Sequence, residues 1–371
     1  MGTPGFKSGS RVCAVWPSFC AIDIPDRPKT TKVILRLHAH AGYSRTTQIL
    51  LLGTCWSGKS TFLKQMRLSY NLAFSKLEIE SSRQCIWADL TDSLKFLVDS
   101  LDPLALPDAL RRAAALVSSA PDIGQHEAFP QAFMFAMQTL WRAAEVQAVI
   151  KDGSGFIYER CAMQPPAYLP VVTQQSISVS YYLAEAPRLF SPAYVPTVQD
   201  LLHVRVRSIG ITETVLRGNG YDMLVVDVGG SKSERRKWLH ALKEVTSIIF
   251  VVSLSGYNEH LIEDKDDNQM RDAMVVWNAI CRSRWFTQSP LVLCLNKNDV
   301  FERQILHSDI VEFFPDFDGE RKKADAGRDY FRERFRDLGE RAGRTLNKDF
   351  FIRVTTATDS EAMKEFMTNS E

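Results

Sequence analysis

A glycine-rich turn between a strand pattern and a helix pattern constrains this chain more than any other feature. The apolar run Ile49–Leu52 is typical of a buried strand, and Gly53–Thr61 follows it with the sequence GTCWSGKST. This is the pattern G-x-x-x-x-G-K-[ST] in its strand-then-helix context. The glycines let backbone amides wrap around an anion, Lys59 adds positive charge, and the Ser60 hydroxyl suits Mg²⁺. The stretch therefore predicts a nucleotide phosphate site.

Length, charge and cysteine content narrow the class of protein. A chain of 371 residues can bury a sizeable core and form two domains. Its 45 basic and 44 acidic side chains nearly balance, which argues against nucleic acid as the main partner. Seven scattered cysteines without C-x-x-C spacing indicate free thiols in a reducing compartment. With no signal-peptide pattern and no apolar run long enough to span a bilayer, we expect an intracellular protein.

The pattern of apolar residues divides the chain into three parts. Residues 1–45 carry several prolines and no sustained period, so we expect an irregular segment there. Residues 71–203 show apolar stripes at helical spacing and predict an all-helical domain. Residues 46–70 and 204–371 alternate strand and helix patterns, which predicts an α/β sheet covered on both faces. The helical domain is thus expected to be an insertion in the α/β domain.

Two apolar stripes at a period of 3.6 residues carry the helical prediction. The first stripe consists of Ile86, Leu90, Leu94, Leu97, Val98 and Leu101. The second stripe consists of Phe133, Met137, Leu140, Trp141 and Ala144. Both indicate the core-facing sides of helices, and neither indicates a cofactor contact.

After residue 204 the pattern predicts a hairpin and then buried strands. Thr212–Leu216 and Met223–Val226 flank a glycine-bearing turn, as a β-hairpin requires. Ser247–Ser253, Leu291–Leu295 and Phe350–Thr355 are short apolar runs of the kind found in parallel sheets.

Two further motifs follow strand patterns and agree with a nucleotide site. Asp227 comes near a strand end and precedes Gly229-Gly230, so its carboxylate can hold Mg²⁺ while a glycine amide faces a γ-phosphate. The sequence NKND at Asn296–Asp299 ends another strand. The Asp299 carboxylate can accept hydrogen bonds from two N–H groups on one edge of guanine, and adenine lacks that pair of donors. The motif favours a guanine nucleotide and disfavours a P-loop ATPase or kinase.

Together these motifs resemble the alpha subunits of heterotrimeric G proteins over about residues 46–366. Further segments in the family's order are KQM at Lys64–Met66, YVPTVQD at Tyr194–Asp200, SERRKW at Ser233–Trp238 and WFT at Trp285–Thr287. The resemblance implies a Ras-like P-loop GTPase domain of α/β class, formed by residues 46–70 and 204–371. It also implies that residues 71–203 are the inserted all-helical domain of that family.

The resemblance assigns roles to individual residues. Arg205 stands where the family keeps its arginine finger, which stabilises charge on the γ-phosphate during attack by water. Ser208 stands in place of a Mg²⁺-binding Thr, so the implied Mg²⁺ ligands are Ser60, Ser208 and Asp227. The implied contacts to GTP or GDP are Trp56, Ser57, Gly58, Lys59, Ser60, Thr61, Ser178, Leu202, His203, Arg205, Ser208, Asp227, Gly230, Asn296, Lys297, Asp299 and Ala357.

Three positions depart from the family's pattern. Ser231 takes the catalytic position of the Gln that orients the attacking water, and its side chain is two atoms too short for that task. Cys55 replaces a P-loop Gly and brings a side chain toward the approaching arginine, while Trp56 replaces an acidic residue. In Ras and G-protein alpha subunits, supplying an arginine finger is worth about 10³–10⁵ in rate, so we expect severely slowed GTP hydrolysis. The alternative is a GTP-bound interaction module without hydrolysis, a pseudo-GTPase.

Arg235 and Glu263 match a pair that holds the family's activated switch.

The resemblance implies a G-protein beta-gamma dimer and a G protein-coupled receptor as partners. The sequence of residues 1–45 lacks the pattern of the family's amphipathic helix, and Asp359–Glu371 is shorter than the family's last helix. These departures weaken the expectation of both partners. The expected location is the cytoplasm, including a peripheral position at the inner face of the plasma membrane.

Overall fold

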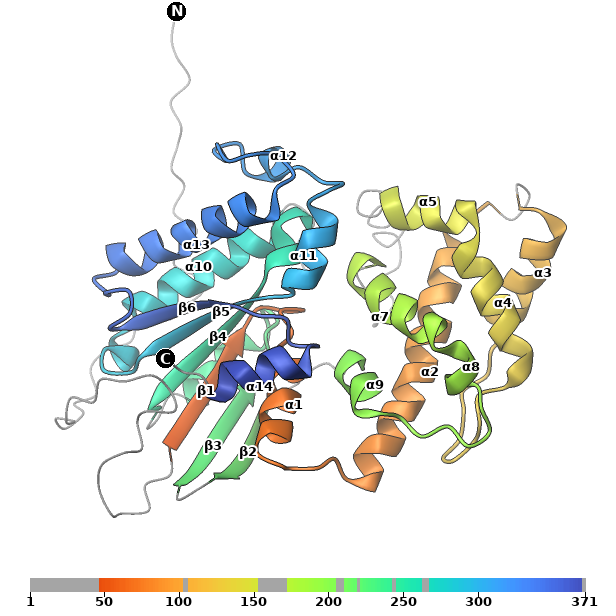
Figure 1. Ribbon diagram of the computed structural model, residues 1–371, viewed down its shortest axis with the longest axis horizontal. Helices are drawn as coiled ribbons and strands as arrows, with labels where there is room; N and C mark the ends of the chain where they lie inside the picture. Colours follow the sequence, from red (N-terminus) through yellow and green to blue (C-terminus); the bar gives the residue numbers. More distant parts are fainter. Residues whose placement is uncertain are drawn as a thin grey trace, which may run out of the picture.

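Within the described residues, six strands form one sheet in the order β2-β3-β1-β4-β5-β6 (Figure 1). β2 runs antiparallel to β3, and the other neighbouring pairs are parallel. The strands are β1 (Thr47–Gly53), β2 (Ile211–Gly218), β3 (Tyr221–Val228), β4 (Ser247–Ser253), β5 (Leu291–Asn296) and β6 (Phe350–Val354). This computed structural model describes residues 47–102, 106–152, 172–204, 210–218, 221–241, 245–261 and 267–368.

The predicted strands are confirmed, with β1 near the middle of the sheet. Residues Ile49–Leu52 are almost completely buried because helices cover both faces of the sheet. The hairpin is formed by β2 and β3, and the three apolar runs form β4, β5 and β6. Strand β6 ends at Val354, one residue earlier than predicted, and the Thr355 amide still donates to the carbonyl of Leu295 at 2.9 Å. The predicted segment 1–45 lies outside the described residues.

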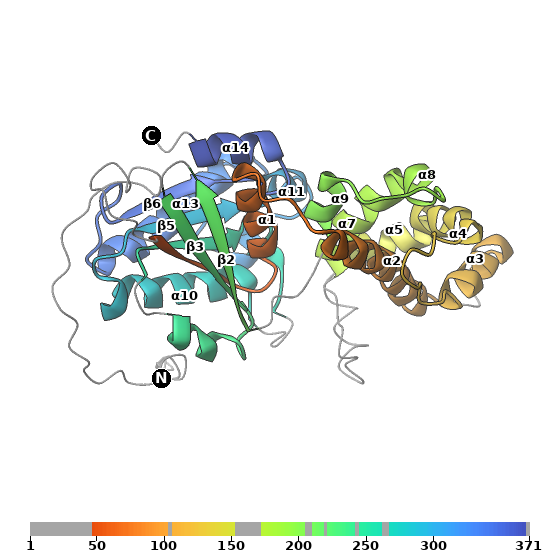
Figure 2. The ribbon, with the colours of Figure 1, turned by 90° about the horizontal axis from the view of Figure 1, so that it is seen from below.

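Helices cover the sheet on both faces, as the alternating pattern predicts (Figure 2). They are α1 (Lys59–Ser69), α10 (Gln269–Arg282), α11 (Asn298–Gln304), α12 (Ile310–Phe313), α13 (Ala324–Arg341) and α14 (Ser360–Thr368). Short 3₁₀ helices join them at η3 (Arg235–Ala241), η4 (Leu254–Asn258) and η5 (Arg284–Phe286). α10 and α13 share a core with one face of the sheet, while α1 and α14 share a core with the other face.

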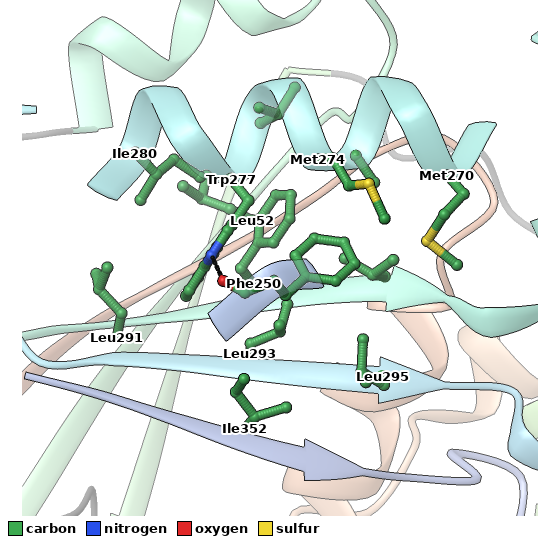
Figure 3. Packing of buried hydrophobic residues seen from close by; sticks show 14 of the residues in the cluster. Leu52, Phe250, Met270, Met274, Trp277, Ile280, Leu291, Leu293, Leu295 and Ile352 are labelled. Atoms are coloured by element: carbon green, nitrogen blue, oxygen red, sulfur yellow. Dashed lines mark hydrogen bonds between the residues drawn. The ribbon is translucent and has the colours of Figure 1, made fainter. Parts of the chain in front are cut away.

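The indole of Trp277 lies at the centre of the larger core, between α10 and the sheet. Figure 3 shows it above Phe250, and the two rings are stacked with centroids 5.8 Å apart. Its Nε1–H donates to the backbone carbonyl of Phe335 in α13 at 3.0 Å, so this buried polar group is satisfied. On the opposite face, the ring of Phe366 in α14 packs edge-on against Phe62 of α1. Met363 and Met367 of α14 are buried in the same core as Phe62.

The helices between α1 and β2 form a block with its own core. Those within the described residues are α2 (Lys76–Asp99), α3 (Asp108–Ser118), α4 (Gln131–Arg142), α5 (Ala144–Asp152), α7 (Val172–Ala184), α8 (Ala186–Leu189) and α9 (Val198–His203). The first predicted stripe lies on α2 and faces this core, except that Leu101 follows the end of α2 at Asp99 and packs against the core from there. The second lies on α4, except that Ala144 begins α5, because Ala143 takes an extended conformation that ends α4. A separate apolar core supports the predicted helical insertion.

The helical block lies beside the sheet, next to α1 and α11 (Figures 1 and 2). The chain enters it through α1 and α2, and returns through α9 toward β2. We retain residues 70/71 and 203/204 as predicted boundaries. In the described part of the chain, no helix is both long and apolar enough to cross a membrane.

Candidate nucleotide site

Three strand ends bring the predicted motifs to one edge of the sheet. β1 ends at Gly53, Asp227 is the next-to-last residue of β3, and β5 ends at Asn296. Because these strands are parallel, their carboxyl ends share the edge where α/β sheets bind ligands. The register places Asp227 opposite Leu51, two residues before Gly53.

The loop after β1 closes tightly because it contains Gly53 and Gly58. A Cβ on Gly53 would collide with the carbonyl oxygen of Val251. Gly58 has φ of +96°, and a Cβ there would collide with the side-chain amide of Asn296. Gly58 is also the residue that precedes α1, so the first amide groups of α1 begin directly after the loop. Such unpaired helix amides favour an anion.

The ammonium of Lys59 lies inside this loop. Its Nζ donates to the carbonyl oxygens of Gly53 at 3.0 Å and Thr54 at 3.2 Å. Burial lowers the pKa of Lys59, and the nearby Asp227 carboxylate raises it in part. A Cβ on Gly230 would lie 2.5 Å from Lys59 Nζ, so this third glycine leaves room for the ammonium. The residues fit a phosphate at Lys59 and a hard cation at the Asp227 carboxylate.

The two unusual loop residues are accommodated by the backbone. Trp56 has φ of +63°, in the left-handed region that non-glycine residues seldom adopt. Cys55 and Trp56 are half-buried, whereas Ser57 is buried and its hydroxyl donates to the carbonyl of Thr54 at 2.9 Å. Backbone strain of this kind concentrates in functional loops.

Asn296 joins the predicted base-binding motif to the phosphate loop. Its Nδ2 donates to the carbonyl oxygen of Ser57 at 2.9 Å, across 239 residues of sequence. Its Oδ1 accepts from the backbone amide of Ala357 at 2.9 Å and from the hydroxyl of Thr355 at 3.2 Å. One buried amide side chain thus fixes three segments that the sequence predicted would share a site.

The carboxylate predicted to recognise guanine remains accessible. Lys297 has φ of +61° and precedes α11, which places Asp299 in the first turn of that helix. The side chain of Asp299 is 41% exposed, and its Oδ2 lies 3.3 Å from Nη2 of Arg303. An exposed ion pair of this kind contributes little, so a base can compete for the carboxylate.

The Ser231 hydroxyl contacts a side chain in its own turn, that of Ser233. The Ser231 side chain is buried, and its hydroxyl lies 3.1 Å from that of Ser233. Its backbone carbonyl accepts from the amides of Glu234 and Arg235. The short hydroxyl thus lies within its own turn.

Arg235 holds this turn through Asp272, a carboxylate that sequence reasoning did not single out. Its guanidinium makes a bidentate ion pair with Asp272 of α10, and its Nε donates to the carbonyl of Gly230 at 3.3 Å. Both side chains of the pair are less than a tenth exposed. Glu263, the predicted partner, lies outside the described residues. Trp238 adds a second anchor, because its indole donates to the carbonyl of Gly229 at 2.8 Å.

Predicted residues of the helical block lie where α9 meets α1. The Ser178 hydroxyl donates to the carbonyl oxygen of His203 at 3.1 Å, and the His203 ring stacks on Tyr181 at 3.9 Å. Burial lowers the pKa of His203, so this ring is neutral at physiological pH. The hydroxyl of Thr61 in α1 donates to the carbonyl of Leu202 at 3.2 Å. Four predicted residues from two blocks therefore meet here.

Other predicted residues divide into two groups. Ser60 lies in the first turn of α1, beside Lys59, whereas Arg205 and Ser208 lie outside the described residues. Across the described ranges no cluster of three His, Cys, Asp or Glu side chains could hold a metal, so a cation would rely on hydroxyls and one carboxylate. Sequence reasoning did not assign Asp272 or Lys64 to the site. The triplet Lys64–Met66 was noted only as a family segment.

Known proteins of one kind are similar to this chain over most of its length. A guanine nucleotide-binding protein alpha-2 subunit of Mycosarcoma maydis is 37% identical over 327 residues, which are 87% of this chain and 86% of that protein. An alpha-2 subunit of Neurospora crassa is 33% identical, with 86% of each chain covered. An alpha-16 subunit of Caenorhabditis elegans is 30% identical, with 86% of this chain and 85% of that protein covered.

The profile of the G-protein alpha subunit family matches residues 29–371, nearly the whole chain. The match includes the loop around Lys59, the Asn296 motif and the complete set of helices between α1 and β2. With both the sheet and the helical insertion accounted for, this chain belongs to the G-protein alpha subunit family.

Proposed function

We propose that this protein is a guanine-nucleotide switch that binds GTP and GDP with Mg²⁺ and hydrolyses GTP slowly. The observation that carries this proposal is the hydrogen bond from Asn296 to the Ser57 carbonyl. It ties the loop around Lys59 to the segment that bears Asp299, so phosphate and base contacts form one site. Asp299 recognises guanine, and the amide of Ala357 faces the same region.

Each residue has a distinct task in this proposal. Lys59 and the amides at the start of α1 bind the β- and γ-phosphates. Ser60, Ser208 and Asp227 hold Mg²⁺, which supplies positive charge that neutralises the phosphate oxygens. The Gly230 amide donates to the γ-phosphate. Arg205 stabilises the charge that develops there during attack by water.

Hydrolysis is slow because Ser231, which stands at the position that orients the attacking water, is unsuited to that task. The Ser231 hydroxyl is buried and lies 3.1 Å from the Ser233 hydroxyl, so it is directed into its own turn. The Cys55 side chain enters the loop where arginine and γ-phosphate approach. Since orientation of the reacting groups supplies much of catalysis, these two changes act in the same direction.

A second candidate function is a pseudo-GTPase that presents a partner-binding surface without turnover. The buried Arg235–Asp272 pair favours it, because this contact holds the segment after Gly230 with the protein's own side chains. In either case we propose a beta-gamma dimer and a G protein-coupled receptor as partners. The corresponding location is the cytoplasm, including the inner face of the plasma membrane.

A single-turnover experiment with γ-³²P-GTP and Mg²⁺ tests the proposal. The wild-type protein should bind GTP in preference to ATP and release phosphate slowly. The double variant Cys55→Gly and Ser231→Gln should release phosphate at least about 100-fold faster, since each change restores part of the transition-state geometry.

The outcomes separate the two candidates. A double variant that binds GTP but stays inactive favours the pseudo-GTPase, whereas fast release by the wild type contradicts slow hydrolysis. Asp299→Asn serves as the specificity control and should abolish the preference for guanine. Wild-type protein that ignores guanine nucleotides would refute the proposed function altogether.

A further inference from the structure

Helix α9 ends against α1, at the junction of the two blocks. The last carbonyl groups of any helix have no amide partner within it. Here α1 supplies the partners from outside, because Lys64 Nζ donates to the carbonyl oxygens of Leu201 at 2.7 Å and Val204 at 3.1 Å. The Thr61 hydroxyl donates to the intervening carbonyl of Leu202. Three of the four carbonyls of residues 201–204 are thus bound by one face of α1.

Lys64 is the strongest of these donors. A charged donor makes hydrogen bonds roughly twice as strong as a neutral one, and a cation is favourable at a helix C-terminus. The distance of 2.7 Å to Leu201 is short for an N–H···O bond. A further hydrogen bond between α9 and the sheet side, from Gln199 to the carbonyl of Thr358, is neutral, exposed and 3.2 Å long.

The surroundings of Lys64 make its position specific. The side chain lies mainly buried where α1, α2 and α9 meet, and Cys85 and Asp89 of α2 are close enough to influence its charge. A long cation placed in such a junction needs acceptors, and the α9 carbonyls provide them. Removing the ammonium would leave two inward-facing carbonyls without their donor.

We propose that Lys64 is a positioning residue that holds α9, and the peptide bond leading into Arg205, against α1. The Val204 carbonyl that Lys64 binds belongs to the peptide bond between Val204 and Arg205. We expect a fixed carbonyl at Val204 to limit the conformations open to the residue that follows it. Lys64 therefore acts on the reaction through Arg205, and it also keeps the two sides of the nucleotide cleft together. The link to catalysis rests on the proposed role of Arg205, whereas the effect on α9 does not.

Hydrogen exchange measured by mass spectrometry tests the structural part directly. In full-length Lys64→Met, peptides that cover residues 198–204 should exchange at least about tenfold faster than in the wild type, as expected for the loss of a hydrogen bond to a charged donor. Peptides from β4 and β5 should be unchanged. If Lys64→Met folds poorly, Lys64→Gln keeps an amide donor and should show a smaller acceleration in the same peptides.

Arg67→Met is the matched control. Arg67 lies one turn further along α1 and is also basic, but its hydrogen bonds go to Glu78 and to the carbonyl of Ala73. Its removal should leave exchange in residues 198–204 at the wild-type rate. Unchanged exchange in both Lys64 variants, or equal acceleration in Arg67→Met, would overturn the proposal.

Two functional readouts extend the test. Release of GDP carrying a fluorescent N-methylanthraniloyl group should be about tenfold faster in Lys64→Met, because the cleft is held less firmly. In the Ser231→Gln background, Lys64→Met should slow phosphate release when Arg205 is present and add nothing when Arg205 is already Ala. A protein that does not bind the labelled GDP contradicts the proposed function, while hydrogen exchange still decides the role of Lys64.

Discussion

The phosphate loop and the contact between α9 and α1 are built in different ways. On the phosphate side, Lys59 bonds to carbonyls five and six residues away, and glycines let the loop close on itself. On the helical side, α9 is held by Lys64 across 137 and 140 residues of sequence. The first side is therefore set mainly by local chain geometry, with Asn296 as its long-range contact, and the second by Lys64 and Thr61 from the other block.

We expect the two regions to open in different ways. A loop closed by its own backbone cannot release its ligand groups without local unfolding. A helix held by a few side chains can separate while both cores remain intact, since each block has its own apolar core. We therefore expect substitutions on the phosphate side to abolish binding, and substitutions around α9 to change stability and exchange.

The largest expected effect tests the local side. Gly58→Ala should weaken GDP binding by more than about 10³-fold, roughly 4 kcal/mol, in an equilibrium titration with fluorescent GDP. The reason is twofold: Gly58 has φ of +96°, and a Cβ would collide with the Asn296 amide that ties the base loop to the phosphate loop. Binding within tenfold of the wild type would show that the loop is more adaptable than its geometry indicates.

Gly343→Ala separates the two reasons. Gly343 also has a positive φ, +84°, but nothing lies within 4 Å of a Cβ placed there. The variant should lose about 1 kcal/mol of stability from backbone strain and keep its nucleotide affinity.

The next effect tests the start of α9, where a buried carboxylate holds the helix. Asp200 is fully buried and makes a bidentate ion pair with Arg188, at 2.8 and 2.7 Å. Its carboxylate also accepts from the hydroxyl of Tyr181 and the amide of Thr197. Burial alone would raise the pKa of Asp200, but these donors hold it at about 2, so the group is charged at neutral pH.

Asp200→Ala should lower the free energy of unfolding by about 3 kcal/mol in urea titrations, because the Arg188 guanidinium and the Tyr181 hydroxyl lose their buried partner. Asp316→Ala is a suitable comparison. That carboxylate is exposed and pairs with Tyr330 and Arg334, so its loss should cost less than about 1 kcal/mol. Equal losses of unfolding free energy in the two variants would mean that burial of the Asp200 network adds nothing to stability.

Much of the local side could be predicted from the sequence. Gly53, Gly58 and Lys59 have fixed spacing because the loop must close over a short distance, and NKND must follow a strand end to reach it. The strands were predictable because buried parallel strands are continuous apolar runs. The break between α4 and α5 was missed because Ala143 carries no turn signal, although its backbone is extended.

The contacts around α9 could not be predicted in the same way. The bonds from Lys64 end on backbone carbonyls, which carry no residue type that a pattern could reveal. Asp272 was missed as the partner of Arg235 for a related reason, since a carboxylate on an amphipathic helix also fits a solvent-facing position. Long-range pairs of this kind depend on how two blocks pack, and a single sequence does not specify that.

The smallest expected effect concerns the charge of Lys64. Burial lowers the pKa of Lys64 to about 8, against an ordinary value of 10.5, and nearby charged or titratable groups modify it: Cys85, Asp89, Arg67 and Glu78. Between pH 8 and 10.5 the unfolded chain therefore binds more protons at this site than the folded protein does. By linkage, the contribution of Lys64 to the free energy of unfolding must rise with pH across this window.

Urea titrations of the wild type and Lys64→Met at pH 7.5, 9 and 10 measure this contribution. The other lysines, tyrosines and cysteines titrate in both proteins, so the difference between the two isolates Lys64. From pH 7.5 to 10, the free energy of unfolding of the wild type should rise relative to that of Lys64→Met by about 1 kcal/mol. If the difference in the free energy of unfolding does not change with pH, or changes in favour of Lys64→Met, the ammonium of Lys64 lies in water. The contrast between the two sides would then lose its basis, because it requires a buried junction around Lys64.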